Sequence, residues 1–186
     1  MADPEQPVDK LLVAISGDIA FIRVHGRGSF MISANMKEFS AAAIDTGCKS
    51  LVLDMAECVS MDSTFMGVLA GLAFRLKQKA AGRITMVNLS FRTRGLLATL
   101  GLDEVIDPHM VGATPESLQP YFQGTADGLT TLDTRENSAR VTAETMIEAH
   151  ENLVKLSPEN LPKFKDVLTF LREDLKATRP DGEKPK

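Results

Sequence analysis

The sequence has few of the residues from which disulfide frameworks and metal sites are built. Its 186 residues include two cysteines, three histidines, one tyrosine and no tryptophan. Cys48 and Cys58 do not form a CxxC pair and have no histidine cluster near them in the sequence, so neither a disulfide framework nor a zinc site is predicted. We expect both cysteines to be small buried side chains, and we expect no metal and no cofactor.

The sequence also lacks a basic excess and a long apolar run. Its 25 acidic and 21 basic residues give a net charge of −4, which repels the phosphates of nucleic acids. No apolar stretch approaches the roughly 20 residues that span a bilayer, and the first residues lack the basic and apolar segments of a signal peptide. We therefore expect no nucleic-acid binding, no membrane insertion and a cytoplasmic location.

Motifs for catalysis are missing as well. The sequence contains no phosphate-binding loop, no serine nucleophile elbow with histidine and acid partners, and no distinct pair of carboxylates. We predict that the protein is not an enzyme.

The residues that are present predict an α/β core. Strands over residues 11–15 and 19–24 flank a short connection that contains Gly17, which is typical of a β-hairpin. Strands and helices then alternate, which implies parallel pairing through right-handed crossovers. The predicted elements are a helix over residues 33–47, a buried strand over 51–53, a helix from about 63 to 82, a strand over 84–87, a helix over 90–100 and a short strand at 105–106.

Beyond Pro108 the composition changes, and a pair of amphipathic helices follows a connector that is rich in glycine, proline and threonine. The second helix carries an apolar seam with heptad-like spacing, formed by Leu161, Phe164, Leu168, Leu171 and Leu175. Such a seam must be covered, either by the chain's own core or by a second copy. The predicted organisation is an α/β domain over residues 8–108, a connector over 109–134, a helical pair over 135–178 and a flexible tail over 179–186.

The most informative segment is LVLDMAECVSMDSTFMGVLAGLAFRL, residues 51–76. A buried strand leads to Asp62, Ser63 and Thr64, and apolar residues then recur at helical spacing from Met66. An aspartate and two hydroxyls therefore lie at a helix N-terminus, where free N–H groups and the helix dipole favour negative charge. Helix capping explains these residue types on its own, but it does not require the whole segment.

The strand, the segment from Met61 to Thr64 and the Gly67-Val68-Leu69 that follows resemble the signature of the STAS domain, the fold of bacterial anti-sigma factor antagonists. The resemblance implies a mixed sheet opened by a β-hairpin, with alternating helices, here followed by a C-terminal helical hairpin. Two departures stand out: the family usually has glycine where this chain has Phe65, and it often has an acidic residue in the loop that here reads GRGSF, residues 26–30.

The resemblance also implies a function. It makes Ser63 the regulatory phosphorylation site, with Thr64 as the alternative, and it implies two partners, an anti-sigma factor with a serine-kinase fold and a separate phosphatase. In that scheme the unmodified protein sequesters the anti-sigma factor and so controls transcription, and phosphorylation weakens the complex. The predicted partner interface is Asp62, Ser63, Thr64, Phe65 and Met66.

Alternatives remain open at this point. The first is a constitutive STAS scaffold without a phosphoswitch, either stressosome-like or the partner of a lipid-transport ATPase.

Helical geometry leaves Phe65 either buried or partly exposed as an interface anchor. His150 faintly resembles the histidine of a phosphotransfer helix, although packing or solvent exposure is the simpler interpretation. A homodimer through the C-terminal helices is a further prediction, because a second copy could cover the apolar seam.

Overall fold

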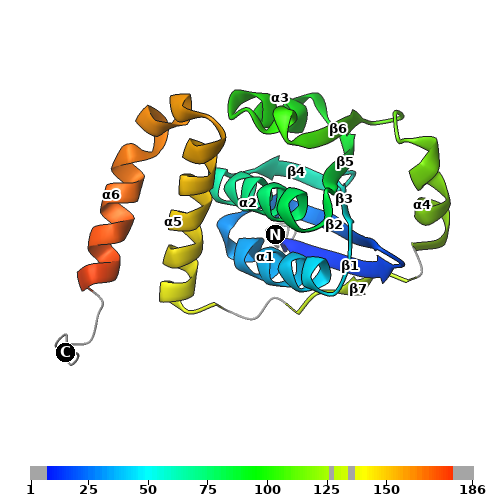
Figure 1. Ribbon diagram of the computed structural model, residues 1–186, viewed down its shortest axis with the longest axis horizontal. Helices are drawn as coiled ribbons and strands as arrows, with labels where there is room; N and C mark the ends of the chain where they lie inside the picture. Colours follow the sequence, from blue (N-terminus) through cyan, green and yellow to red (C-terminus); the bar gives the residue numbers. More distant parts are fainter. Residues whose placement is uncertain (1–7, 126–127, 134–136, 178–186) are drawn as a thin grey trace, which may run out of the picture.

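The computed structural model describes residues 8–125, 128–133 and 137–177, and these form a mixed α/β structure (Figure 1). Strands β1 and β2 make the predicted antiparallel hairpin, with Gly17 at φ +60° in its turn. The sheet order is β6-β5-β3-β2-β1-β7, and β4 also pairs with β2. The strands are β1 (Lys10–Ser16), β2 (Ile19–Gly28), β3 (Ser50–Asp54), β4 (Cys58–Met61), β5 (Arg83–Leu89), β6 (Ile106–Met110) and β7 (Thr130–Thr131).

The helices cover both faces of this sheet. Helices α1 and α2 lie on one face (Figure 1), where Ile22 and Leu53 join the main apolar core. Phe21 points to the opposite face, and Tyr121 and Phe122 of α4 pack on it with ring centroids 5.3 and 6.1 Å away. The α-helices are α1 (Phe30–Asp45), α2 (Ser63–Ala80), α3 (Phe91–Thr99), α4 (Gln119–Thr125), α5 (Ala139–Leu156) and α6 (Leu161–Ala177); short 3₁₀ turns are η1 (Leu102–Glu104), η2 (Glu116–Leu118) and η3 (Pro158–Asn160).

The predicted fold class is confirmed, with three differences in its elements. Helix α1 begins at Phe30 rather than at residue 33, because the carboxylate of Asp62, distant in sequence, accepts from the Phe30 N–H at 2.7 Å. Strands β4 and β7 were not predicted. Each has at most four residues and is recognisable as a strand only from its pairing, β4 with β2 and β7 with β1. The connector over residues 109–134 contributes η2, α4 and β7, of which β7 joins the edge of the sheet.

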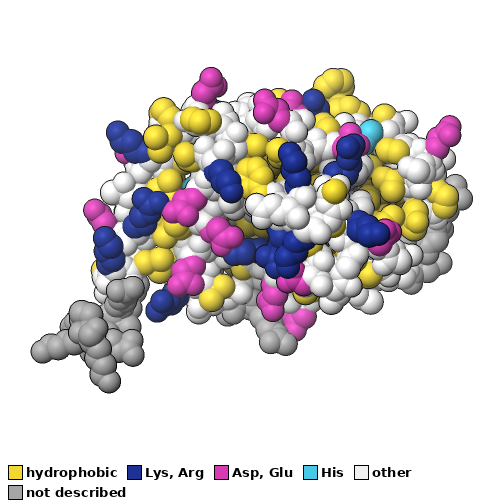
Figure 2. Space-filling view, viewed as in Figure 1, with side chains coloured by type: hydrophobic (Ala, Val, Ile, Leu, Met, Phe, Trp, Pro, Cys, Tyr) yellow, Lys and Arg dark blue, Asp and Glu magenta, His cyan; other side chains and the backbone are white. Residues whose placement is uncertain are grey.

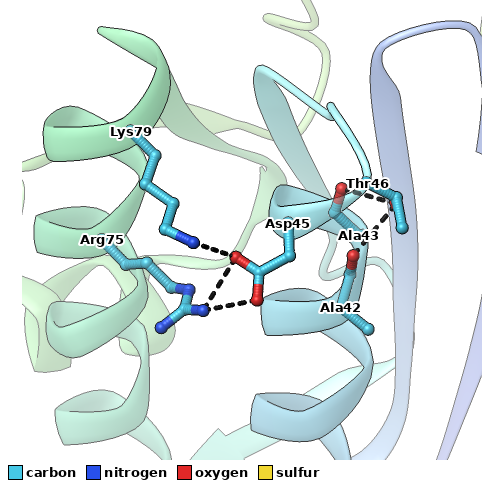
Figure 3. A network of polar contacts seen from close by, with 6 residues as sticks. All are labelled: Ala42, Ala43, Asp45, Thr46, Arg75 and Lys79. Carbon is cyan, nitrogen blue, oxygen red and sulfur yellow. Dashed lines mark hydrogen bonds and ion pairs between the residues drawn. The ribbon is translucent and has the colours of Figure 1, made fainter.

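Ion pairs join the carboxyl ends of α1 and α2 (Figure 3). Both carboxylate oxygens of Asp45 accept from Arg75, at 2.8 and 2.6 Å, and one also accepts from Lys79. The Lys79 hydrogen bond, followed by that of Arg75, lowers the pKa of the Asp45 carboxyl below its ordinary value. These two cations offset the unfavourable position of a carboxylate at the negative end of a helix dipole.

The C-terminal helical pair packs on the chain's own core. Helix α5 lies against α2 and α1, and α6 packs on α5 (Figure 1). Phe164, Leu168 and Leu171 of the predicted seam are buried by this packing, whereas Leu161 remains 48% exposed. The seam is therefore covered within one chain and does not require a second copy. The apolar seam is thus no longer a reason to expect a homodimer, which stays a prediction. The predicted tail over residues 179–186 lies outside the described residues.

Candidate functional site

The carboxylate of Asp62 joins the starts of two helices. As the N-cap of α2, it accepts from the Phe65 N–H at 2.8 Å through Oδ1. Its Oδ2 accepts from the N–H of Phe30, the first residue of α1, at 2.7 Å. Both oxygens thus satisfy N–H groups that have no partner within their own helices, which explains why an aspartate stands at this position.

The hydroxyl of Ser63 lies 2.9 Å from Nε2 of His150, which belongs to α5. Nδ1 of the same ring lies 2.7 Å from the carbonyl oxygen of Met146. Since a carbonyl only accepts, Nδ1 carries the proton, and Nε2 of the neutral ring must accept from Ser63. The serine predicted as the modification site therefore donates one of the hydrogen bonds that join the α/β core to α5.

His150 is neutral because it is buried. Its side chain is 3% exposed, and its ring lies 4.8 Å from that of Phe164 in α6. Burial lowers the pKa of His150 below its ordinary value, and this effect outweighs the Met146 carbonyl and the Asp62 charge, which both raise it. The simple interpretation of His150 as a packed core histidine is correct, but sequence analysis did not identify Ser63 as its partner.

The remaining predicted site residues are buried. Thr64, Phe65 and Met66 have exposed fractions of 3%, 0% and 4%, whereas Asp62 and Ser63 are partly exposed. Of the two interpretations left open for Phe65, the buried one is correct, and its ring lies against Gly28 of β2. The two departures from the family pattern, Phe65 and the segment over residues 26–30, are therefore in direct contact; the structure places this predicted loop mostly in the end of β2 and the start of α1.

A carboxylate does reach that loop, although from another element. Asp9, just before β1, accepts from the Arg27 N–H at 2.9 Å and from the Ser29 hydroxyl at 3.1 Å. Asp9 therefore supplies the acidic group that the loop itself lacks, and it fixes the backbone that leads into α1.

Apolar side chains are exposed where the parallel strands end. Strands β2, β3, β4 and β5 run parallel, so their carboxyl ends lie at one edge of the sheet, the edge from which α2 starts at Ser63. Phe30 and Met31 follow β2, Val59 lies in β4, and Phe91 follows β5. Their exposed fractions are 42%, 62%, 58% and 90%, and we refer to these four residues as the apolar edge.

Sequence analysis missed the apolar edge because local hydrophobicity does not distinguish an exposed aromatic residue from a buried one. The available signal was position, since Phe30 and Phe91 come directly after Ser29 and Ser90, the serines that follow β2 and β5. On the molecular face shown in Figure 2, charges of both signs are interspersed around yellow apolar areas. That face therefore presents no single-sign surface of the kind that binds nucleic acid.

Helices α2 and α5 approach each other closely next to Ser63. A Cβ atom on Gly67 would lie 2.2 Å from the carbonyl oxygen of Ala149, and one on Gly71 would lie 2.4 Å from Nδ2 of Asn152. Only glycine fits at position 67 while α5 stays where it is, because the neighbouring atoms are backbone; at position 71 the neighbour is the end of the Asn152 side chain, which would have to move. The Asn152 amide also reaches the Gly67 carbonyl, at 3.4 Å.

Within the described ranges, no three histidine, cysteine, aspartate or glutamate side chains group as metal ligands. In the same part of the chain, no helix combines the length and the apolar character needed to cross a membrane.

Comparisons with known proteins agree with this geometry. A family profile described as "Mlab, STAS domain" matches residues 11–112. The anti-sigma factor antagonist SpoIIAA in its unphosphorylated form is 21% identical, with 61% of this chain and 96% of that chain covered and a TM-score of 0.50. An anti-sigma factor antagonist from Mycobacterium paratuberculosis is 18% identical, with 61% and 93% covered and a TM-score of 0.51.

A putative anti-sigma factor antagonist from Thermotoga maritima is 14% identical, with 59% and 91% covered and a TM-score of 0.50. At these identities the solved structures establish the shared fold. A search among curated proteins finds no match. The profile match ends at residue 112, so α5, α6 and His150 lie outside it.

Proposed function

The chain belongs to the STAS domain family, and on this premise we propose that it is an anti-sigma factor antagonist, a non-enzymatic module that sequesters an anti-sigma factor with a serine-kinase fold. Solved structures with this fold are described as anti-sigma factor antagonists, which supports the proposal. The observation that supports the proposal best is the position of Ser63 as the first residue of α2, at the same sheet edge as the exposed Phe30, Val59 and Phe91.

In the proposed mechanism the unmodified protein binds its partner through the apolar edge and the start of α2. The partner transfers the γ-phosphoryl group of ATP to the Ser63 oxygen, ADP leaves, and a phosphatase later removes the phosphate. A phosphoserine carries close to two negative charges at neutral pH, and the start of a helix tolerates them. The added charge beside Asp62 disfavours the apolar contact, so binding weakens while the core remains folded. The buried hydroxyl of Thr64 makes it the less accessible alternative site.

The proposal is tested by incubating the full chain with ATP and a serine-kinase-type anti-sigma factor encoded beside it, and then locating the phosphate by mass spectrometry. Phosphate should appear on Ser63 and be absent from Ser63→Ala. In binding assays, Ser63→Asp should bind the anti-sigma factor about 1–3 kcal/mol more weakly than Ser63→Ala. Equal affinities of the two variants would rule out the charge switch.

A second candidate is a constitutive STAS scaffold, stressosome-like or the partner of a lipid-transport ATPase, that uses the same edge without a switch. The observation in its favour is that the Ser63 hydroxyl already has a partner in its own chain, His150. A scaffold of this kind would be recovered from lysate with its partner in equal yield whether residue 63 is serine, alanine or aspartate.

A further inference from the structure

We propose that the hydrogen bond from Ser63 to His150 holds the helical pair α5–α6 on the STAS core, and that phosphorylation of Ser63 releases the pair. The inference rests on the proposed function only in taking Ser63 as the phosphorylated residue. It adds a consequence that the charge switch alone lacks, namely a change in how α5 and α6 are held.

Phosphorylation removes the proton that Ser63 donates to His150. Phosphorylation turns the Ser63 hydroxyl into an ester oxygen, which has no hydrogen to donate. Nε2 of His150 then has no donor, because the ring's proton is on Nδ1 and is committed to the Met146 carbonyl at 2.7 Å. A buried acceptor without a partner destabilises the arrangement that buries it, which here is the docked position of α5.

The space between Ser63 and His150 is also too small for a phosphate. Ser63 Oγ and His150 Nε2 are 2.9 Å apart, which leaves no room for a phosphate between them. The ring cannot move aside, since it is 3% exposed and lies against Phe164. If the phosphate instead turns toward solvent, Nε2 still loses its donor. Both orientations weaken the contact between α2 and α5.

The close crossing makes release a two-state event. The contact at Gly67 and Ala149 is between backbones, so even a small outward shift of α5 loses this close contact with α2. Helices α5 and α6 are joined to each other, because Asn160 between them donates to the Leu153 carbonyl at 2.9 Å and Phe164 packs on His150. Release of the pair must also break the hydrogen bonds that Asn160 and Lys163 donate to the Leu100 and Thr99 carbonyls at the end of α3, at 3.1 and 2.9 Å.

The core can remain folded when the pair leaves. The family profile ends at residue 112, and the similar solved structures are covered over 91–96% of their own length by about 60% of this chain. Domains with this fold therefore exist without helices equivalent to α5 and α6.

Release exposes a surface that is hidden in the unmodified protein. The apolar edge is already exposed when α5 is docked, so partner binding to the unmodified form needs no opening. After phosphorylation, the face of α2 that contains Gly67 and Gly71 and the apolar face of α5 become accessible. The modified protein thereby differs from the unmodified one in shape as well as in charge.

The test measures amide hydrogen exchange in the full chain with phosphoserine installed at position 63. We expect the amides of α5 to exchange at least about tenfold faster than in the unmodified chain, the effect of leaving one buried acceptor unpaired. The amides of β3 and β5 should keep their protection, which shows that the core has not unfolded. The measurement needs no partner protein, so its result does not depend on finding a kinase or an anti-sigma factor.

A matched control is Ser90→Asp, which places a carboxylate at the N-cap of α3 and leaves the Ser63–His150 hydrogen bond intact. It should leave the exchange of α5 unchanged. A second control is the double variant Gly71→Cys/Asn152→Cys, in which the close approach of these positions allows a disulfide and the asparagine side chain that would clash is removed. When oxidised, it should keep α5 protected despite phosphoserine; when reduced, it should not.

Two results would overturn the proposal. One is phosphoserine at position 63 with α5 as protected as before, which would mean that His150 has taken a proton and pairs with the phosphate. The other is rapid exchange of α5 in the unmodified chain, which would mean that the Ser63 hydrogen bond does not hold the pair.

Discussion

Gly28 and Phe65 share one space: a Cβ atom on residue 28 would lie 2.8 Å from Cδ1 of the Phe65 ring. The large side chain at the start of α2 is therefore accommodated by the absence of a side chain in β2. This complementarity explains how the chain carries phenylalanine where its family usually has glycine without altering the helix start.

The pair predicts a non-additive double variant. Phe65→Ala should lower the free energy of unfolding by about 3–5 kcal/mol through cavity formation, and Gly28→Ala by roughly 1–3 kcal/mol through overpacking. The double variant should lose clearly less than the sum, since the alanine at position 28 then enters the space left by the ring. Urea unfolding of the four proteins measures this coupling. Additivity within about 0.5 kcal/mol would mean that the two residues do not share that space.

A second prediction concerns the crossing of α2 and α5. Gly67→Ala should undock α5 because its new methyl group would overlap the Ala149 backbone, and proteolysis between β7 and α5 should become faster. The matched control is Gly95→Ala in α3, where no atom lies within 4 Å of the added Cβ. That control should be neutral or stabilise the protein by roughly 0.5–1 kcal/mol through helix propensity. Equal proteolysis of the two variants would contradict the close crossing.

A third prediction follows from the lowered pKa of His150. The unfolded chain binds a proton at this residue near the ordinary value of 6.5, whereas the folded chain binds it only at lower pH. Stability should therefore fall as the pH drops below about 6.5 and should be unaffected by this group at higher pH. Urea unfolding between pH 5 and pH 8 (about a thousandfold range in proton concentration) measures the slope. His150→Gln, which can still accept from Ser63, should show a shallower slope; an unchanged slope would mean that His150 is not the group responsible.

A fourth prediction tests the apolar edge. Phe91→Ala should weaken binding of the anti-sigma factor by more than about 1 kcal/mol, because an exposed aromatic side chain that becomes buried in a complex is a typical hot spot. Its free energy of unfolding should change by no more than about 0.5 kcal/mol, since Phe91 is 90% exposed. Phe170→Ala is the control, because this α6 residue is also exposed, at 65%, but lies away from the edge. Similar losses of affinity in both variants would remove Phe91 from the interface.

The fold was predictable because its signals are local. The hairpin turn at Gly17, the buried strand before Asp62 and the alternation of strands and helices each depend on residues close in sequence. The start of α1 was misplaced because the carboxylate that accepts from its first N–H belongs to Asp62, which follows β3 and β4 in the sequence. Short strands such as β4 have no periodic pattern to detect and are defined by the partner strand.

The site was predictable only in part, because its missing members are tertiary. Asp62 and Ser63 were found from the helix start that they form, and both are partly exposed at the edge of the sheet. His150 lies 87 positions from Ser63 along the chain, and no spacing rule connects them. The exposure of Phe65 could not be decided because α2 is covered by the sheet on one side and by α5 on another, so one apolar stripe does not identify its buried face.

Strand β7 gives the C-terminal helices a short tether. Thr131 pairs with Leu12 on the edge of the sheet, the Leu132 N–H donates to the Leu11 carbonyl at 2.8 Å, and α5 begins at Ala139. A helical pair joined to its docking surface by so few residues experiences an effective concentration of the order of millimolar. Its return to α2 is thus a unimolecular step, independent of dilution. In the proposed release, the position of this equilibrium would depend on the chemical state of residue 63 and not on how much of the protein the cell contains.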